Sequence, residues 1–326
     1  MIKPVTDYLV RLAAGLGEGW TRFWFTPSDP ATLSAIRLFT GAIVVYLHAT
    51  LSFDLIRFFG PAGLLDSGDI RPLEAGSFSY LNYLSTPGEL WTAHLIGLAV
   101  LIMFMAGWWT RITSVLALVV FLSDIHRAAM ITGRTESIAA MVMCYLCLAP
   151  CGRRFSLDRL SARRAALAGP AGQAANQDLS TSATIATRLI QVHLALLVAM
   201  MGFSKLLGEV WWSGGGVWWL IARPESRSLD LTWLYATPKV IDFWTHAVVL
   251  FELGFPVLIW VPLARPLLLA IAAVVWTSLA LITGETTFAM MLMIASMAFI
   301  SPGVLGVCCR RSVEPPAASA APGGSP

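Results

Sequence analysis

Lys205 is the side chain in this sequence whose type and position point most directly to chemistry. It is one of three lysines in the chain, and it stands at the end of a long apolar run that begins near Ala183. An ammonium group at that depth in an apolar segment is costly unless it is paired or neutralised, so we regard it as a candidate functional group. The alternative is structural: Lys205 extends to the membrane surface or pairs with Glu209, one helical turn further on.

Tryptophans come after Lys205 in the sequence, before and after a glycine-rich stretch. Two pairs of tryptophans, at 211–212 and 218–219, flank the sequence Ser-Gly-Gly-Gly at 213–216. Paired aromatic residues beside a glycine-rich break are typical of a membrane–water boundary. Lys205 is therefore expected just inside the edge of a bilayer.

The composition places this lysine in a polytopic membrane protein. Of the 326 residues, 57% are hydrophobic and only 13% are charged, against roughly 45–50% and 25% in soluble domains. Spans of about 20 residues each use up most of the chain, so we expect one membrane domain and no second, soluble one. The net charge is +3, but the sequence has no basic tract of the kind that binds nucleic acid. We therefore expect no nucleic-acid partner.

The predicted fold class is all-α: a polytopic integral membrane helical bundle of about eight transmembrane helices, preceded by an amphipathic helix. Residues 1–26 carry charges among apolar residues and are predicted to lie on the membrane surface. Residues 27–305 form the transmembrane domain, and the Pro-, Ala- and Gly-rich residues 306–326 form a disordered cytoplasmic tail. The apolar runs that predict the spans are at 31–51, 89–108, 112–130, 136–150, 183–207, 240–261, 265–282 and 286–304.

Arginines predict the orientation of the bundle. Five of them fall between residues 153 and 164, and short loops rich in lysine and arginine stay on the cytoplasmic side. Counting spans outward from this loop places both termini in the cytoplasm.

With this orientation, most polar residues of the spans fall at the outer ends. They are His48, His94, Asp124, His126, Arg127, Glu136, Lys205, Asp242, His246 and Glu285. Asp242 and His246 are four residues apart and share a helix face. We interpret the segregation as an outward-facing polar cavity, although helix ends are also where polar side chains cost least. Arg37 and Glu252 lie deeper, and we predict that they pair with each other.

The sequence predicts no metal centre. Cys144, Cys147 and Cys151 recur at helical spacing, but no second CxxC motif and no nearby pair of histidines completes a zinc or redox site. Buried thiols that pack in the core are the better interpretation. The sequence also carries no nucleotide-binding or nucleophile-elbow motif.

Five motifs, in their order and spacing, carry a family resemblance. They are PSDPATLSAIRLFTG at 27–41, FLSD at 121–124, RRFSLDRL at 153–160, GFSKL at 202–206 with a Trp-x-Gly sequence after it, and LFELGFPVLIW at 250–260. Together they resemble the vitamin K-dependent gamma-carboxylase and its bacterial relatives, the horizontally transferred transmembrane domain proteins. The resemblance covers about residues 25–305.

This resemblance implies an all-helical membrane core with its reaction chamber on the extracytoplasmic side, in a bacterial inner membrane. Lys205 matches the lysine proposed in the carboxylase as the base that deprotonates reduced vitamin K, which implies Lys205 as base and a reduced quinone as cofactor. Burial beside apolar walls favours the neutral amine that such a base needs. Further catalytic candidates are Asp242, His246 and Glu136. Candidates for binding the quinol are Trp212, Trp218, Asp124 and His126.

The chain also departs from the family in two respects. It lacks the large lumenal domain through which the carboxylase holds its protein substrate, and Arg134-Thr135-Glu136 stands where the family has Asn-Asn-His. We therefore expect a quinol-dependent oxygenase or epoxidase rather than a protein carboxylase. Its partners are the lipid bilayer and a lipid-soluble quinol, and the sequence identifies no protein partner.

The alternative is a non-catalytic membrane module of the same fold, either a partner subunit or a small-solute pathway. The two interpretations differ in the surroundings that they predict for Lys205. On the catalytic one, Lys205 lines an outward-opening cavity with aromatic or apolar walls, close to a polar side chain from the span at 240–261 or from the turn at 132–135. On the other, these polar residues are dispersed on lipid-facing surfaces.

Overall fold

The computed structural model describes residues 2–60, 63, 78–168, 179–224 and 228–304. Within these ranges the regular structure is helical, apart from one isolated bridge between Ser28 and Ser180. The predicted all-α class is therefore confirmed. The tail predicted at 306–326 lies outside the described residues.

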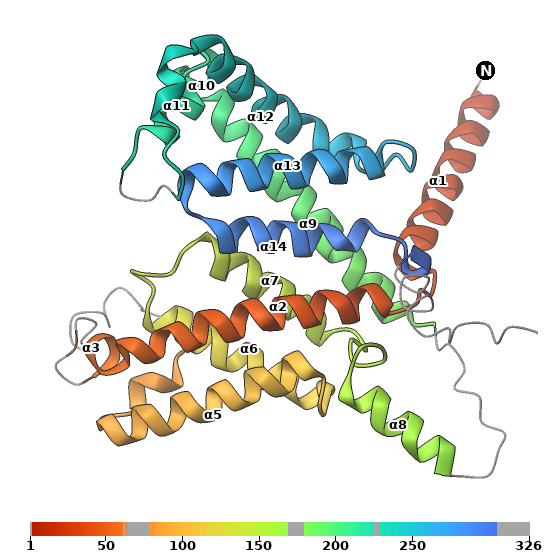
Figure 1. Ribbon diagram of the computed structural model, residues 1–326. Helices are drawn as coiled ribbons and strands as arrows, with labels where there is room; N and C mark the ends of the chain where they lie inside the picture. Colours follow the sequence, from red (N-terminus) through yellow and green to blue (C-terminus); the bar gives the residue numbers. More distant parts are fainter. Residues whose placement is uncertain (1, 61–62, 64–77, 169–178, 225–227, 305–326) are drawn as a thin grey trace, which may run out of the picture.

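A bundle of long helices forms the body of the molecule (Figure 1). One helix lies in each of the eight apolar runs of the sequence. The bundle helices are α2 (Ala31–Thr50), α5 (Pro87–Ala106), α6 (Thr110–Arg127), α7 (Arg134–Cys147), α9 (Thr181–Leu206), α12 (Pro238–Leu258), α13 (Arg265–Thr283) and α14 (Thr286–Ser296).

Shorter helices and one longer surface helix connect and flank the bundle. The α-helices among them are α1 (Ile2–Phe25), α3 (Leu55–Phe59), α8 (Leu157–Ala168), α10 (Glu209–Trp212) and α11 (Gly216–Ile221). Single turns of 3₁₀-helix are η1 (Leu51–Phe53), η2 (Tyr80–Tyr83), η3 (Thr232–Ala236) and η4 (Met297–Phe299).

Five of the described helices are long and apolar enough to cross a membrane: α2 with η1, α5, α9, α12 and α13. The other three bundle helices are shorter or more polar. α14 with η4 is apolar but shorter, α7 has 14 residues, and α6 carries Arg111, Asp124 and Arg127 within 18 residues. The predicted count of eight spans is thus supported for five of them and stays a prediction for the other three.

The surfaces of these five helices suit a lipid environment. Only 28 to 39% of the residues in their most apolar stretches are buried inside the molecule. Large apolar side chains face outward, among them Ile96 of α5, Leu250 of α12 and Val274 of α13, all more than 60% exposed. Soluble monomers rarely expose apolar surface of this extent. The fold therefore fits an integral membrane protein.

The bundle has two distinct ends (Figure 1). One end carries α8 and α1, which is steeply inclined to the bundle helices, and we call it the α1/α8 end. The other carries α3, α10 and α11, and we call it the α10/α11 end. Because α8 contains Arg159, Arg163 and Arg164, the preference of arginine for the cytoplasmic side assigns the α1/α8 end to the cytoplasm. This assignment stays a prediction.

The helix predicted for residues 1–26 is present as α1, and α9 holds its last turn. Arg188 of α9 donates to the carbonyl of Phe23 at 3.2 Å, and its guanidinium carbon lies 4.3 Å from the centroid of the Phe23 ring. Residues 10–22 of α1 are exposed, including apolar Leu16 and Trp20. An exposed helix with one apolar face suits the predicted position on a membrane surface.

Arg37 is completely buried in α2, and its guanidinium donates hydrogen bonds to four backbone carbonyls. Nη1 donates to the carbonyls of Phe104 at 2.5 Å and Met105 at 2.8 Å. Nε donates to that of Cys151 at 3.2 Å, and Nη2 to that of Phe155 at 2.6 Å. One arginine therefore joins α2 to the end of α5 and to the turn that follows α7.

The predicted pair between Arg37 and Glu252 is wrong, since Glu252 pairs with Lys205 instead. The carbonyls at the end of a helix have no partner within that helix, and its dipole favours a cation there. Arg37 is satisfied by such carbonyls at the end of α5. It therefore needs no carboxylate, which the prediction did not consider.

Asp158 of α8 caps the start of α6. Its carboxylate accepts hydrogen bonds from the backbone N–H groups of Trp109 and Thr110, both at 2.8 Å, and from the Thr110 hydroxyl at 2.6 Å. Carboxylates are favourable at helix starts, where N–H groups lack partners. The contact fixes α8 against the turn between α5 and α6.

Acidification is expected to weaken this contact. Partial burial raises the pKa of Asp158, but its hydrogen bonds with Thr110 and Trp109 and the charge of Arg37 outweigh burial and hold the pKa below its ordinary value. Such a carboxyl stabilises the fold above its unfolded-state pKa of about 3.9, and this contribution is lost as the pH falls through the folded-state value. Thermal unfolding in detergent should therefore show a loss of stability below about pH 4 that is smaller in Asp158→Asn. An equal loss in the variant would contradict the assignment.

Candidate functional site

Lys205 and Glu252 form an ion pair close to the α10/α11 end of the bundle. Lys205 Nζ lies 2.8 Å from one carboxylate oxygen of Glu252 and 2.7 Å from the other. The Glu252 side chain is fully buried, and that of Lys205 is 14% exposed. Nζ also lies 5.0 Å from the centroid of the Trp211 ring, within the range of a cation–π contact. The ammonium group thus has a carboxylate and an aromatic face as neighbours.

Close helix packing explains why these two charges meet. Gly202 lies one turn before Lys205 on α9, and a Cβ at that position would come within 3.2 Å of the backbone of Glu252. The missing side chain therefore lets α9 and α12 approach closely. Glu252 shares the buried face of α12 with Val248 and Phe255. Its carboxylate consequently points into the bundle and not into lipid.

Lys205 lines a pocket of about 250 Å³ that α9, α13 and α14 enclose with α10. Trp211, Trp276 and Phe288 form aromatic walls, and leucine side chains complete the apolar lining. The sequence predicts a cavity with such walls, and a polar side chain of the span at 240–261 beside Lys205. The structure has both the walls and the polar neighbour, which is Glu252. That the cavity opens on the outer side of the membrane stays a prediction.

A second ion pair lies at the same pocket. Arg134, at the start of α7, donates to the carboxylate of Glu285, just before α14. The guanidinium carbon of Arg134 also lies 5.0 Å from the centroid of the Phe288 ring. The side chains of Arg134 and Glu285 are 64% and 39% exposed, so they form the polar rim of a mostly apolar cavity.

Asp242 and His246 lie together, but apart from Lys205. The Asp242 carboxylate is 3.0 Å from His246 Nδ1, as their four-residue spacing predicts. Asp242 lines a separate hollow of about 670 Å³, and neither residue is among the described residues that line the Lys205 pocket. The reason is distance along α12: ten residues separate Asp242 from Glu252, which is about 15 Å along the helix axis.

The tryptophans predicted to bind the quinol also lie outside the Lys205 pocket as its described lining defines it. Trp212 is 63% exposed, and its Nε1 donates to the carbonyl of Leu206 at 2.6 Å. Trp218 lines the hollow that contains Asp242, with its ring centroid 5.8 Å from that of Tyr235. Trp211 reaches Lys205 instead, because successive residues of the short helix α10 point in different directions.

Glu136 and His126 have local roles. The Glu136 carboxylate accepts a hydrogen bond from the N–H of Gly133 at 2.9 Å, which completes the start of α7. His126 Nδ1 lies 2.8 Å from the carbonyl oxygen of Phe78. Neither residue is among the described residues that line the Lys205 pocket.

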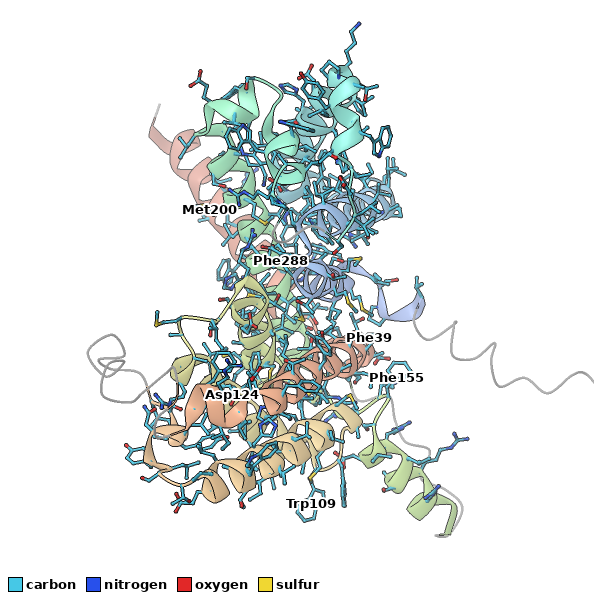
Figure 2. All side chains as sticks on the ribbon, turned by 60° about the vertical axis from the view of Figure 1, so that its left-hand side comes forward. Phe39, Trp109, Asp124, Phe155, Met200 and Phe288 are labelled. Carbon is cyan, nitrogen blue, oxygen red and sulfur yellow. The ribbon has the colours of Figure 1, made fainter. Side chains whose placement is uncertain are left out.

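Asp124 belongs to a buried polar cluster among α2, α5 and α6. His48 Nδ1 is 2.7 Å from Asp124 Oδ2, and His48 Nε2 is 3.1 Å from the carbonyl oxygen of His94. The rings of His48 and His94 stack with their centroids 4.2 Å apart, and His94 Nε2 is 2.7 Å from Ser52 Oγ. Figure 2 shows Asp124 well away from Phe288, a wall of the Lys205 pocket.

The hydrogen bonds of this cluster determine its charge. A carbonyl oxygen only accepts, so the contact with His94 places a hydrogen on His48 Nε2. The contact between His48 Nδ1 and Asp124 then holds one further proton, on the ring or on the carboxyl group. In both cases the pair is neutral as a whole, which suits its burial.

Sequence reasoning missed several residues of the Lys205 pocket. Glu252 did carry a signal, because a charge in the middle of a span needs a partner, but the sequence did not indicate which cation it meets. Trp276 lies inside an apolar run and gives no signal of its own. Arg134 stands where the family motif has asparagine, and an arginine between two predicted spans can reach a pocket at their ends.

Comparisons of this chain with protein-family models, with curated proteins and with solved structures found no match. The pocket around Lys205 and Glu252 is thus the candidate functional site on geometric grounds.

Proposed function

We propose that this chain is an integral membrane enzyme that binds a lipid-soluble quinol in the Lys205 pocket and removes a proton from it, as its resemblance to the carboxylase family implies. The observation that supports the proposal best is the position of the Lys205 amine. It stands at the wall of an aromatic cavity and has a fully buried carboxylate as its partner. A lysine that only anchored α9 at a membrane surface would need neither feature.

The lining of the pocket suits a quinol head group. A volume of about 250 Å³ is slightly below the roughly 300–1,000 Å³ of sites that enclose whole small molecules. A ring system can therefore enter while an apolar tail stays in lipid. Trp211 and Trp276 offer flat faces for stacking, and Arg134 offers N–H donors for the ring oxygens. The hydroxyls of Ser204 and Thr283 donate to the carbonyls of Met201 and Leu279, so their oxygens remain available to accept from the hydroxyl groups of the quinol.

Lys205 and Glu252 together can accept a proton. Transfer of one ammonium proton to Glu252 leaves a neutral amine and a neutral acid, and burial disfavours unbalanced charges. The amine then takes the proton of a ligand hydroxyl, and the new ammonium is balanced by the negative charge left on the ligand. A quinol held there would supply the electrons for a reaction with dioxygen.

Mass spectrometry of the purified protein tests the binding step. The full chain, extracted in a mild detergent, should carry a quinone at a near-stoichiometric level. Trp276→Ala removes part of the aromatic wall, so this variant should lose most of the bound quinone. Trp212→Ala, which changes a residue outside the pocket, should retain the quinone. Equal quinone content in these two variants would contradict binding at this pocket.

Lys205→Met is expected to abolish quinol oxidation while leaving the bound quinone in place. The substitution keeps most of the volume but removes the amine, and loss of a general base lowers a rate by about 10²- to 10⁴-fold. Quinol-dependent oxygen consumption in detergent or liposomes measures the effect. Lys239→Met and Glu209→Gln are matched controls, since both residues are exposed and neither lines the pocket. Unchanged oxidation in a well-folded Lys205→Met protein would refute the role of base.

One observation favours the alternative, a non-catalytic membrane module. Both carboxylate oxygens of Glu252 contact the Lys205 ammonium, as expected for an ion pair with a purely structural role. Asp242 and His246, which the catalytic interpretation places beside Lys205, lie outside the described lining of its pocket. On this interpretation no quinone co-purifies, and Lys205→Met lowers only stability. The two experiments above therefore distinguish the two functions.

A further inference from the structure

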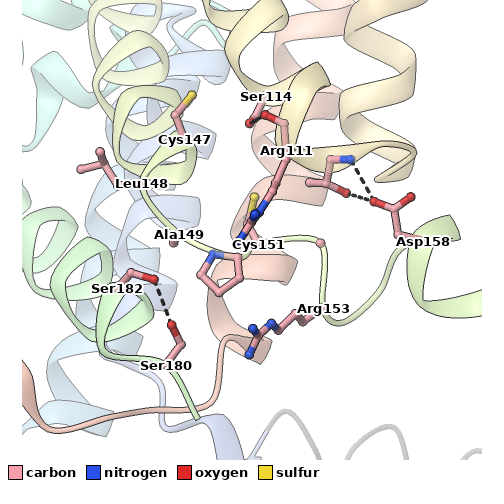
Figure 3. Close-up of a pocket in the computed structure, with 13 residues that line it drawn as sticks. Arg111, Ser114, Cys147, Leu148, Ala149, Cys151, Arg153, Asp158, Ser180 and Ser182 are labelled. Atoms are coloured by element: carbon pink, nitrogen blue, oxygen red, sulfur yellow. Dashed lines mark hydrogen bonds between the residues drawn. The ribbon is translucent and has the colours of Figure 1, made fainter. Parts of the chain in front are cut away.

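A second pocket, of about 560 Å³, opens at the α1/α8 end, far from Lys205 along the chain. It lies between the start of α6, the end of α7 with the turn after it, and the start of α9. Figure 3 shows the Arg111 side chain running from α6 toward the turn that carries Cys151 and Arg153, with Ser180 and Ser182 on the opposite wall. Guanidinium and hydroxyl groups thus converge on one space.

The described residues that line the pocket include more basic than acidic groups. Arg111 and Arg153 contribute guanidinium groups, and Asp158 contributes a carboxylate. That carboxylate is engaged in its own wall, where it accepts three hydrogen bonds from Trp109 and Thr110. Among the residues that the structure describes, none accepts a hydrogen bond from the Arg111 side chain. An anion that enters the pocket would therefore meet an available donor.

The aromatic residues around this pocket place it at the level of lipid head groups. Trp108 and Trp109, in the turn before α6, are 51% and 64% exposed. Exposed tryptophans are enriched at the membrane–water interface. α8 presents the exposed apolar side chains of Leu157 and Leu160 in the same region, together with its arginines. The pocket thus opens where the phosphate groups of a bilayer would lie.

We propose that this pocket binds the phosphate group of an anionic phospholipid. Arg111 and Arg153 bind the phosphate oxygens with charge-assisted hydrogen bonds. The Ser180 and Ser182 hydroxyls share one hydrogen bond of 2.9 Å, which leaves one hydroxyl hydrogen to donate to the head group. Basic pockets between membrane helices on the cytoplasmic side are suited to such head groups. The proposal does not depend on the function of Lys205, because the two pockets share no described residue.

Thermal unfolding of the full chain in a neutral detergent tests the proposal, with tryptophan fluorescence as the signal. The probes are phosphatidylglycerol, phosphatidylcholine and inorganic phosphate. Phosphatidylglycerol should raise the unfolding midpoint in a saturable way, and phosphatidylcholine should not. If inorganic phosphate at millimolar concentration leaves the unfolding midpoint unchanged, the bound phosphate group is that of the lipid. If inorganic phosphate reproduces the shift, the site binds free phosphate. If no probe raises the midpoint, or both lipids raise it equally, the proposal is overturned.

Variants localise the effect. Arg111→Gln and Arg153→Gln should each weaken the apparent affinity for phosphatidylglycerol by about tenfold or more, as expected for loss of a charge-assisted hydrogen bond. Arg159→Gln is the matched control: it removes the same charge from neighbouring α8, but Arg159 does not line the pocket. Arg111→Lys keeps the charge and should keep most of the response. Equal responses of Arg111→Gln and Arg159→Gln would overturn the proposal.

Discussion

Glu252→Leu should lower the free energy of unfolding by about 3–5 kcal/mol, because it leaves the Lys205 ammonium in the bundle without its counter-charge. The Lys205 side chain is only 14% exposed, so water cannot replace the lost carboxylate fully. Unfolding in mixed micelles of a mild detergent and dodecyl sulfate measures the change. Glu209→Leu, which removes an exposed carboxylate four residues from Lys205, is the matched control and should stay near the wild-type value.

The double variant Lys205→Met with Glu252→Leu should recover most of this loss. With both charges removed, the desolvation penalty disappears and an apolar pair fills the space. The two single effects are thus expected to be strongly non-additive, as holds for residues in direct contact. If the losses simply add, the two side chains do not form the pair described above.

Arg37→Met should be at least as disruptive. It removes the Arg37 donor from four carbonyls, of which that of Phe104 still accepts from the N–H of Gly107 at 3.1 Å. An unsatisfied buried acceptor costs about 1–3 kcal/mol. The yield of monodisperse protein after extraction should fall sharply. Arg57→Met provides the control, because the Arg57 side chain is 75% exposed and contacts Asp54 only at 3.7 Å.

A second substitution shows whether the loss comes from these carbonyls. Arg37→Lys keeps the charge but offers three donors on one nitrogen in place of the planar fork that reaches four oxygens. It should recover only part of the yield. Recovery to the wild-type level would mean that the charge alone matters, and the hydrogen bonds of the guanidinium group would then not explain the loss.

The positions of the helices could be predicted from the sequence because lipid imposes a simple rule. An apolar run bounded by polar residues must form its hydrogen bonds internally, so it forms a helix. The run at 112–130, for instance, largely coincides with α6 at Thr110–Arg127. The same rule does not decide whether such a helix crosses the membrane, because Arg111, Asp124 and Arg127 within α6 are also typical of a buried or interfacial helix.

The partners of buried charges could be predicted only where they are local. The contact of Asp242 with His246 follows from the 3.6-residue period of one helix. The contact of Lys205 with Glu252 joins residues 47 apart and depends on how closely α9 approaches α12 at Gly202. Arg37 was misassigned for a different reason: its partners are backbone carbonyls, which every residue has and which no sequence pattern marks.

The bonds of Arg37 also constrain the order in which the protein can be assembled. Its partners lie 67 to 118 residues further along the chain. At a synthesis rate of about 5–20 residues per second, the last of them emerges from the ribosome roughly 6–24 s after Arg37 itself. The carbonyls of Phe104 and Met105 are made first, and those of Cys151 and Phe155 follow only near the end of that interval. We therefore expect α2 to complete its packing only after the turn that follows α7 has been synthesised.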